Sequence, residues 1–228
     1  MAKKIYLSPS DQTANKYAYG GTNEAVQCRR IADAAEKALK RCGFLVKNNK
    51  TSSMVARVDE SNSWGADLHV PIHTNAYNKS VTGTRIFCWN KTGEGYKASK
   101  AVYNALAPLT PGTSENVSVN AELYEIKYPY APSVYIEVDF HDVARIAQWI
   151  IEHVEDIGEA ICEGICKHFG VKYVEPEQPK AYHIVLGEYG TIKEADAALG
   201  AIYAKLEAAA GAVAEVDKEL RKAKIVEG

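Results

Sequence analysis

The sequence predicts an α/β layered domain, because short strand-like segments alternate with segments whose apolar residues recur every three or four positions. Residues 133–140 have the pattern of a compact buried strand, and residues 143–169 carry the longest run of helical spacing. The hydrophobic share of 46% over 228 residues is enough to build a core. The other expected strands cover 4–8, 44–47, 67–73 and 84–89, and the other expected helices cover 24–42, 54–64 and 95–106.

The helix boundaries follow from local signals. In the first expected helix the apolar residues keep helical spacing: Cys28, Ile31, Ala35, Leu39 and Cys42. Gly43 then suits the C-terminal cap, where a left-handed conformation is common. The last long helix would exceed the usual length of globular helices, so we expect a break near Glu152 or His153.

The composition changes after residue 170. Residues 171–180 are acidic and proline-rich, which is typical of a linker. A short strand at 182–187 and an alanine-rich helix at 192–210 follow, and the tail from 211 to 228 is expected to contain a second helix or strand. We therefore expect a domain at 1–170, a linker at 171–180 and a small α/β or helical module at 181–228, with self-association as one possible role for the module.

Composition excludes several functional classes. The net charge of −2 gives no electrostatic basis for binding nucleic acid, and no apolar run reaches the ~20 residues that span a bilayer. The five cysteines are scattered without a CxxC pair, and Cys162 and Cys166, one helical turn apart, are expected to be small buried hydrophobic residues. The N-terminus becomes polar before a signal peptide could form, so we expect synthesis and folding in a reducing cytoplasm.

One apolar strand ends on a histidine. In residues 67–76 the side chains of His69 and His73 share one strand face, about 13 Å apart, so they cannot share a metal without ligands from elsewhere. Glu137 lies within an otherwise buried strand, where an unpaired carboxylate would be costly, and Glu24 opens a helix after a glycine-containing loop. His141 follows the strand of Glu137. These residues are candidates to join His73 in one site at the edge of the sheet.

The order of these residues resembles that of the zinc-dependent N-acetylmuramoyl-L-alanine amidases of the amidase_3 family. The matching stretches are 5–10, 20–24, 66–76 and 131–140, and the resemblance covers about residues 3 to 170. It implies a mixed twisted sheet flanked by helices. It also implies a Zn²⁺ ion held by Glu24 and His73, with Glu137 as the catalytic base.

The loop after the first strand departs from the family pattern. Members usually carry a zinc-binding histidine in an Asp-Pro-Gly-His-Gly loop, whereas this chain has Ser-Pro-Ser-Asp-Gln at residues 8–12. Similarity to phage-type members with a Ser-Pro-Ser-x-Gln start favours Gln12 as the remaining metal ligand, with Asp11 or His141 as alternatives. His69 shares the face of His73 but lies too far along the strand.

The resemblance implies a peptidoglycan hydrolase that cleaves the amide between N-acetylmuramic acid and L-alanine, as a phage endolysin or a bacterial autolysin. Asn75 is expected to shape the turn behind His73, and Tyr17 and Tyr19 to line the rim for substrate. The alternatives are a wall-binding relative that lost activity with the first histidine, and a zinc peptidase acting on stem peptides. An endolysin would act on the wall after holin-type release or lysis, and the module at 181–228 would target the wall or mediate self-association.

Overall fold

The computed structural model describes residues 2–50, 53–113, 116–177 and 191–209. The contacts divide the chain into two units, Met1–Pro176 and Glu177–Gly228. In the second unit the described part is a helix, α7 (Ile192–Ala209), close to the helix expected at 192–210. The strand expected at 182–187 and the tail at 211–228 lie outside the described residues, and the role of the module stays a prediction.

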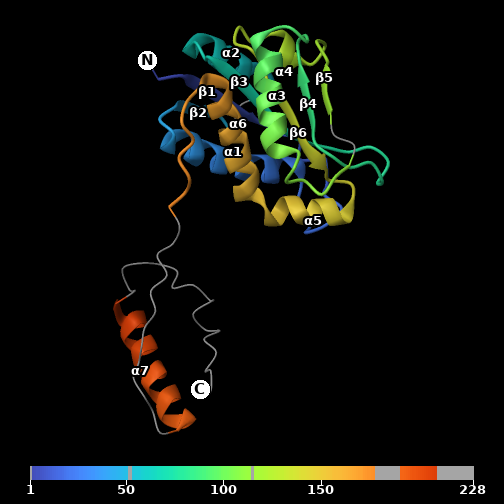
Figure 1. The fold of residues 1–228 in the computed structure, drawn as a ribbon. Helices are drawn as coiled ribbons and strands as arrows, with labels where there is room; N and C mark the ends of the chain where they lie inside the picture. Colours follow the sequence, from blue (N-terminus) through green and yellow to red (C-terminus); the bar gives the residue numbers. More distant parts are fainter. Residues whose placement is uncertain (1, 51–52, 114–115, 178–190, 210–228) are drawn as a thin grey trace. The chain divides into compact units, whose positions relative to one another are not determined.

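The first unit is built on a six-stranded mixed sheet, as the family resemblance implies (Figure 1). In sheet order the strands are β2 (Leu45–Asn48), β1 (Lys4–Pro9), β3 (Leu68–Asn75), β6 (Tyr135–Phe140), β4 (Arg85–Cys88) and β5 (Asn116–Val119). Strands β2, β1, β3 and β6 run parallel, β4 runs antiparallel to β6, and β5 is parallel to β4.

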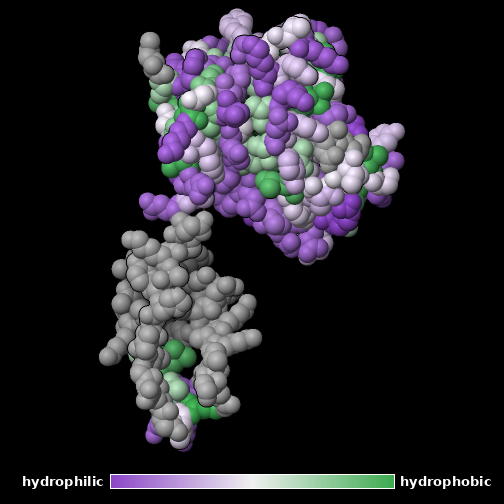
Figure 2. Space-filling model, viewed as in Figure 1, coloured by the Kyte–Doolittle hydropathy of each residue, from purple (hydrophilic) through white to green (hydrophobic). Residues whose placement is uncertain are grey.

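Three long helices lie together over one face of the sheet (Figure 1). They are α1 (Glu24–Arg41), α3 (Glu94–Leu106) and α6 (Val154–Phe169). The helix α6 packs against both of the others, and Gly164 permits the approach to α3, because a Cβ there would lie 2.4 Å from the Cα of Val102. The outer surface of this layer is mostly hydrophilic in Figure 2, so its apolar residues face the sheet.

Alternation along the strands separates an apolar face from a polar face. On β1, Ile5 and Leu7 belong to the hydrophobic core under α1, whereas Tyr6 and Ser8 face α2 (Met54–Trp64). The Tyr6 hydroxyl donates to Glu60 of α2 over 2.8 Å. Strand β3 continues the pattern. Its residues Leu68, Val70 and Ile72 enter the core, while His69 stacks on Tyr6 with ring centroids 5.4 Å apart. The face shared by His69 and His73 is thus the polar one.

The long C-terminal helix of this unit is broken, as its length predicts. The segment α5 (Ala144–Glu152) ends at His153, whose φ of −113° and ψ of 29° leave the helical region, and α6 begins at Val154. Gly43, with φ of +88°, lies just beyond the cap of α1. Both positions agree with the sequence-based expectation.

Two short elements were not expected. Strand β5 has the sequence Asn-Val-Ser-Val at the edge of the sheet, and α4 (Tyr124–Lys127) is a single helical turn. Four residues are too few for a periodic pattern to emerge. Among the described residues, no helix has both the length and the apolar character needed to cross a bilayer.

Candidate metal centre

His73 lies near the C-terminal end of β3 and is 6% exposed. Its ring stacks on Tyr135 of the neighbouring strand β6, with centroids 4.6 Å apart and 15° between the planes. Two carboxylates approach the ring from different elements. His73 Nδ1 lies 2.8 Å from Oε1 of Glu24, and His73 Nε2 lies 3.7 Å from Oε2 of Glu125. The imidazole is therefore fixed between an aromatic face and two acidic side chains.

Glu24 reaches His73 from the first residue of α1. The helix begins after Asn23, whose side chain accepts a hydrogen bond from the backbone N–H of Val26, so the loop before it is tied to the helix end. Asn15 of this loop donates its Nδ2–H to Oε2 of Glu24 over 2.6 Å. Burial favours the neutral form of Glu24, but the hydrogen bond and positive charge of His73 and the hydrogen bond from Asn15 together outweigh it and lower the pKa of the carboxyl. Glu24 is ionised at neutral pH.

Gln12 lies in the same loop, beside the His73–Glu24 pair. Its Nε2 is 3.5 Å from Nδ1 of His73, and its Oε1 accepts a hydrogen bond from Asn15 over 2.8 Å. The loop therefore places the amide of Gln12 next to the ring of His73. Its oxygen, the atom that would bind a metal, is held by Asn15.

The alternative ligands Asp11 and His141 are engaged elsewhere. Asp11 has a side chain that is 46% exposed, and its Oδ2 lies 3.4 Å from Nη1 of Arg57. His141 Nδ1 lies 2.9 Å from Oγ1 of Thr74, and its ring stacks on Tyr17. Among the described residues, neither side chain forms a hydrogen bond or ion pair with His73.

The residues expected to bind substrate take different positions. Tyr17 is 6% exposed and donates its hydroxyl to Thr74 over 3.0 Å, so it supports the strand end from inside rather than lining a rim. Tyr19 is 46% exposed and stays available at the surface. Asn75 accepts a hydrogen bond from the backbone N–H of Ala76 over 2.8 Å, and its expected part in shaping the turn stays a prediction.

Glu137 lies on β6 directly beside His73, because the two residues are paired in the parallel ladder. Its Oε2 is buried and has no hydrogen-bond partner, although the residue as a whole is only partly buried. Burial raises the pKa of Glu137 to about 7, with the positive charge of His73 opposing the shift and the negative charge of Glu24 adding to it. A carboxyl that is close to half ionised at neutral pH is suited to accept and return a proton.

Glu125 is a site residue that sequence analysis missed. It lies on α4, is 1% exposed, and accepts a hydrogen bond from the hydroxyl of Ser8. Its Oε1 is 3.3 Å from Nε2 of His69. Burial alone would raise its pKa, but the nearby imidazoles of His69 and His73 and the hydrogen bond from Ser8 together outweigh burial and lower the pKa to about 2.

Arg57 of α2 supplies the positive charge behind Glu125. It is 1% exposed, donates from Nε to the hydroxyl of Ser8 over 2.7 Å, and lies 4.0 Å from Glu125. A buried arginine and a buried glutamate form a network only when folding brings α2 and α4 onto the same face of the sheet. Each segment mixes charged residues of both signs, so the sequence gave no sign of which ones would be buried together.

The electrostatics of His73 lead to a pH prediction for the metal-free protein. Burial lowers the pKa of an imidazole, but the nearby carboxylates of Glu125, Glu24 and Glu137 raise that of His73 from 6.5 to about 9. The protonated ring therefore stabilises the fold fully below pH 6.5, and this contribution is lost as the pH rises through about 9. Urea unfolding of chelated protein at pH 6 and pH 9 should show a fall of a few kcal/mol. The fall should be smaller in His73→Ala, and an equal fall in both proteins would refute this origin.

The donor set matches the ligand chemistry of zinc. His73 and Glu24 supply an imidazole and a carboxylate, and their near atoms are 2.8 Å apart, near the ~3.3 Å between ligands that zinc bonds of ~2.0–2.1 Å produce. Buried atoms beside them have no hydrogen-bond partner, namely Nε2 of His73, Oε2 of Glu125 and Oε2 of Glu137. Among the described residues, however, no third histidine, cysteine or acid offers a ligand atom that lies within 4.8 Å of a ligand atom of both members of the pair at once. The pair can hold a metal only with Gln12 or solvent completing the coordination.

Comparison with known proteins gives the family. Residues 8–167 match the Amidase_3 family model, described as N-acetylmuramoyl-L-alanine amidase. An uncharacterised 38.4 kDa protein of Clostridium perfringens is 30% identical over 177 residues, which cover 72% of this chain and 51% of that protein. The chain thus spans about half the length of this relative.

Solved structures share the fold. The catalytic domain of CwlV, an N-acetylmuramoyl-L-alanine amidase from Bacillus (Paenibacillus) polymyxa var. colistinus, superposes with a TM-score of 0.68 at 17% identity, covering 75% of this chain and 99% of that one. AmiC2, an N-acetylmuramoyl-L-alanine amidase of Nostoc punctiforme, gives 0.67 at 18% identity, covering 74% and 97%. The catalytic domain of the CD27L endolysin, which targets Clostridia difficile, gives 0.57 at 20% identity, covering 72% and 97%. With the family match over residues 8–167, the chain belongs to the Amidase_3 family of N-acetylmuramoyl-L-alanine amidases, a family of zinc-dependent hydrolases.

Proposed function

We propose that the chain hydrolyses the amide that joins the lactyl group of N-acetylmuramic acid to L-alanine in peptidoglycan. The family match supports the substrate class, and one observation in the structure supports the chemistry. The His73–Glu24 pair, 2.8 Å apart, lies beside a carboxyl whose pKa is raised to about 7. Hydrolysis by a zinc enzyme requires side chains that bind the metal and a nearby group that accepts a proton, and this arrangement provides both.

In this proposal His73 and Glu24 hold zinc, with Gln12 as the neighbouring amide. When bound, the zinc ion supplies a water of lowered pKa and polarises the scissile carbonyl. Glu137 takes the proton of the water and returns it to the amine of the departing L-alanine. Burial of its Oε2 keeps the proton affinity of Glu137 high enough for both transfers.

Glu125 orients His73 in the same proposal. If Nδ1 of His73 binds the metal beside Glu24, Nε2 carries a hydrogen and points toward Oε2 of Glu125, 3.7 Å away. A carboxylate behind a metal-bound histidine fixes the tautomer of the ring and raises its basicity. Ser8 and Arg57 keep this carboxylate ionised and in place.

Product analysis tests the activity. Purified peptidoglycan treated with the protein should release free α-amino groups of L-alanine, without new reducing ends and without new amino groups within the stem peptide. The inactive control is His73→Ala, and His153→Ala is the matched histidine control, because His153 is partly exposed, pairs with Asp156 over 2.8 Å and stacks on Trp149 of α5. New amino termini at other stem-peptide positions would favour the zinc peptidase, and the absence of any product would favour a non-catalytic relative.

The amide of Gln12 is the observation that favours the wall-binding alternative, since an amide oxygen is a weak, uncharged ligand. The substitution Gln12→His tests its effect. An imidazole at this position, close to Nδ1 of His73, should raise zinc affinity by about tenfold or more and raise kcat with it. Competition with a zinc chelator measures the affinity, and Gln12→Asn is the control that keeps an amide. An unchanged or lower affinity in Gln12→His would show that residue 12 does not face the metal.

A further inference from the structure

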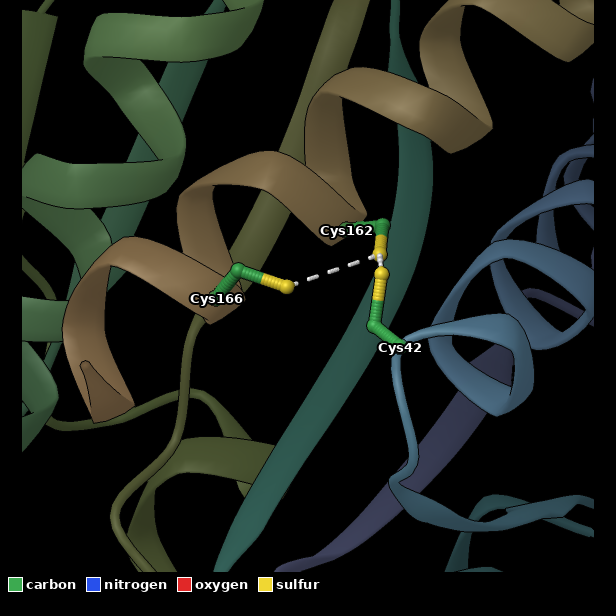
Figure 3. A group of neighbouring side chains, drawn as sticks. All are labelled: Cys42, Cys162 and Cys166. Carbon is green, nitrogen blue, oxygen red and sulfur yellow. Dashed lines mark hydrogen bonds between the residues drawn. The ribbon is translucent and has the colours of Figure 1, made fainter. Parts of the chain in front are cut away.

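Three cysteines from two distant parts of the chain meet inside the helical layer (Figure 3). Cys42 caps the C-terminal end of α1, and Cys162 and Cys166 lie one turn apart on α6. The sulfur of Cys162 is 3.6 Å from that of Cys42 and 3.9 Å from that of Cys166, and all three lie within 4.8 Å of one another. All are free thiols, and none is more than 9% exposed. Their burial agrees with the sequence-based expectation, but the meeting with Cys42 was not foreseen.

The spacing of the sulfurs is that of ligands around one metal ion. Zinc–sulfur bonds of ~2.3 Å place neighbouring sulfurs about 3.8 Å apart in a tetrahedral site and about 4.0 Å apart in a trigonal one. Sulfurs of a disulfide are ~2.05 Å apart, so the cysteines are not paired in that way. Among the described residues this is the only set of three histidine, cysteine or acidic side chains whose ligand atoms come this close together.

A second observation is that polar groups point at the sulfur of Cys42. The backbone N–H of Val174 donates to this sulfur over 3.3 Å, and such a donor stabilises a thiolate. The guanidinium of Arg41 donates to the carbonyl of the same Val174 over 2.8 Å, and it also forms an ion pair with Glu159 at 2.5 Å. The Arg41–Glu159 pair thus fixes the backbone carbonyl of the residue whose N–H points at the sulfur.

A route to the cluster exists from the surface. A pocket of about 390 Å³ lies beside Cys166, between α3 and α6, and is lined also by Gly164, Lys167 and Tyr173. The wall of the pocket thus includes one residue of the set. The pocket also leaves room for a water or a small thiol as a fourth ligand.

We propose that Cys42, Cys162 and Cys166 form a binding site for a soft cation with a filled d shell, Zn²⁺ or Cu⁺. Thiolate ligands select these ions over harder cations. The ion would bind as each ligating thiol releases its proton to solvent, with no change of oxidation state. It would tie the end of α1 to α6 and to the backbone that follows α6, separately from the centre at His73.

Burial sets the pH dependence of this site. It raises the pKa of Cys166 to about 12, with Cys42 adding to the effect, and that of Cys162 further, with Cys42 and Cys166 adding to it. The metal must therefore displace tightly held protons, so its affinity should fall as the pH is lowered.

Cadmium titration of the full chain tests the proposal. In a His73→Ala background, which disables the other centre, reduced protein should bind one Cd²⁺ with the ultraviolet absorption of thiolate-to-metal charge transfer. The intensity of this absorption band should correspond to three thiolate ligands per Cd²⁺ ion. It should fall by about a third or more in Cys162→Ser, and it should be unchanged in Cys28→Ser, the control at a buried cysteine outside the cluster.

Parallel competition titrations with Zn²⁺ and with Cu⁺ identify the preferred ion, and either result supports the site. Thermal unfolding with and without metal provides a second readout, since binding to the folded state raises the Tm. If Cys162→Ser fails to fold, Cys166→Ala replaces it. Absence of the charge-transfer band in folded protein, or an equal band in the cluster variant, would overturn the proposal.

Discussion

Replacing Glu137 by Gln should lower kcat by about 10²–10⁴-fold while leaving zinc binding intact. The change removes the proton acceptor but keeps the size and the burial of the side chain. Glu137 lies beside His73 in the ladder between β3 and β6, and its buried Oε2 makes no hydrogen bond that the substitution would break. The rate of wall lysis and the zinc content of the purified variant are the two measurements.

The pH dependence of activity tests whether Glu137 acts as the catalytic base. A base of pKa about 7 is active in its ionised form, so wild-type activity should fall as the pH drops below 7. The residual activity of Glu137→Gln should lack this acidic limb. Glu122→Gln is the matched control, because its side chain is 83% exposed. Wild-type activity in Glu137→Gln would contradict the proposed role, and loss of zinc would indicate a ligand instead.

Replacing Arg57 by Met should lower the free energy of unfolding by about 3–5 kcal/mol. The arginine is 1% exposed, and its Nε holds the hydroxyl of Ser8, which in turn donates to Glu125. Without the guanidinium of Arg57, the buried carboxylate of Glu125 loses a nearby positive charge, and this loss destabilises the folded state. Methionine fills a similar volume, so lost packing contributes little.

Urea unfolding checks this prediction, with Arg30→Met as the control. Arg30 is exposed and bonds Gln27 of its own helix over 2.7 Å, so its replacement should change stability by no more than about 0.5 kcal/mol. The double variant Arg57→Met/Glu125→Gln should recover part of the loss, because it removes the unpaired charge as well. Equal stability of Arg57→Met and the wild-type protein would show that the network does not support the fold.

Residues in long periodic elements could be placed from the sequence. The alternation in β3 put His69 and His73 on one face, and the helical spacing located α1 and the interrupted helix at His153. Glu137 could be identified as a candidate because burying an unpaired carboxylate in an apolar strand is energetically costly. These signals are local, and the structure preserves them.

Residues brought together only by the tertiary fold escaped sequence analysis. Glu125 lies in a single helical turn, and Arg57 lies on a helix whose pattern shows only one buried charge. The three cysteines were read as separate because Cys42 and Cys162 are 120 positions apart. Tyr17 was placed at a rim because glycines follow it, whereas its hydroxyl reaches Thr74 inside the fold. Side-chain contacts between distant segments carry no periodic signature.

The zinc content of protein that lacks the cysteine cluster tests the central claim most directly. In a Cys162→Ser background, which prevents the cysteine cluster from contributing, the purified chain should retain zinc after dialysis, near one equivalent. His73→Ala and Glu24→Ala should each abolish this binding, whereas His153→Ala should retain it. Absence of zinc in the parent, or retention of a full equivalent in both His73→Ala and Glu24→Ala, would contradict the assignment of this pair as the metal centre.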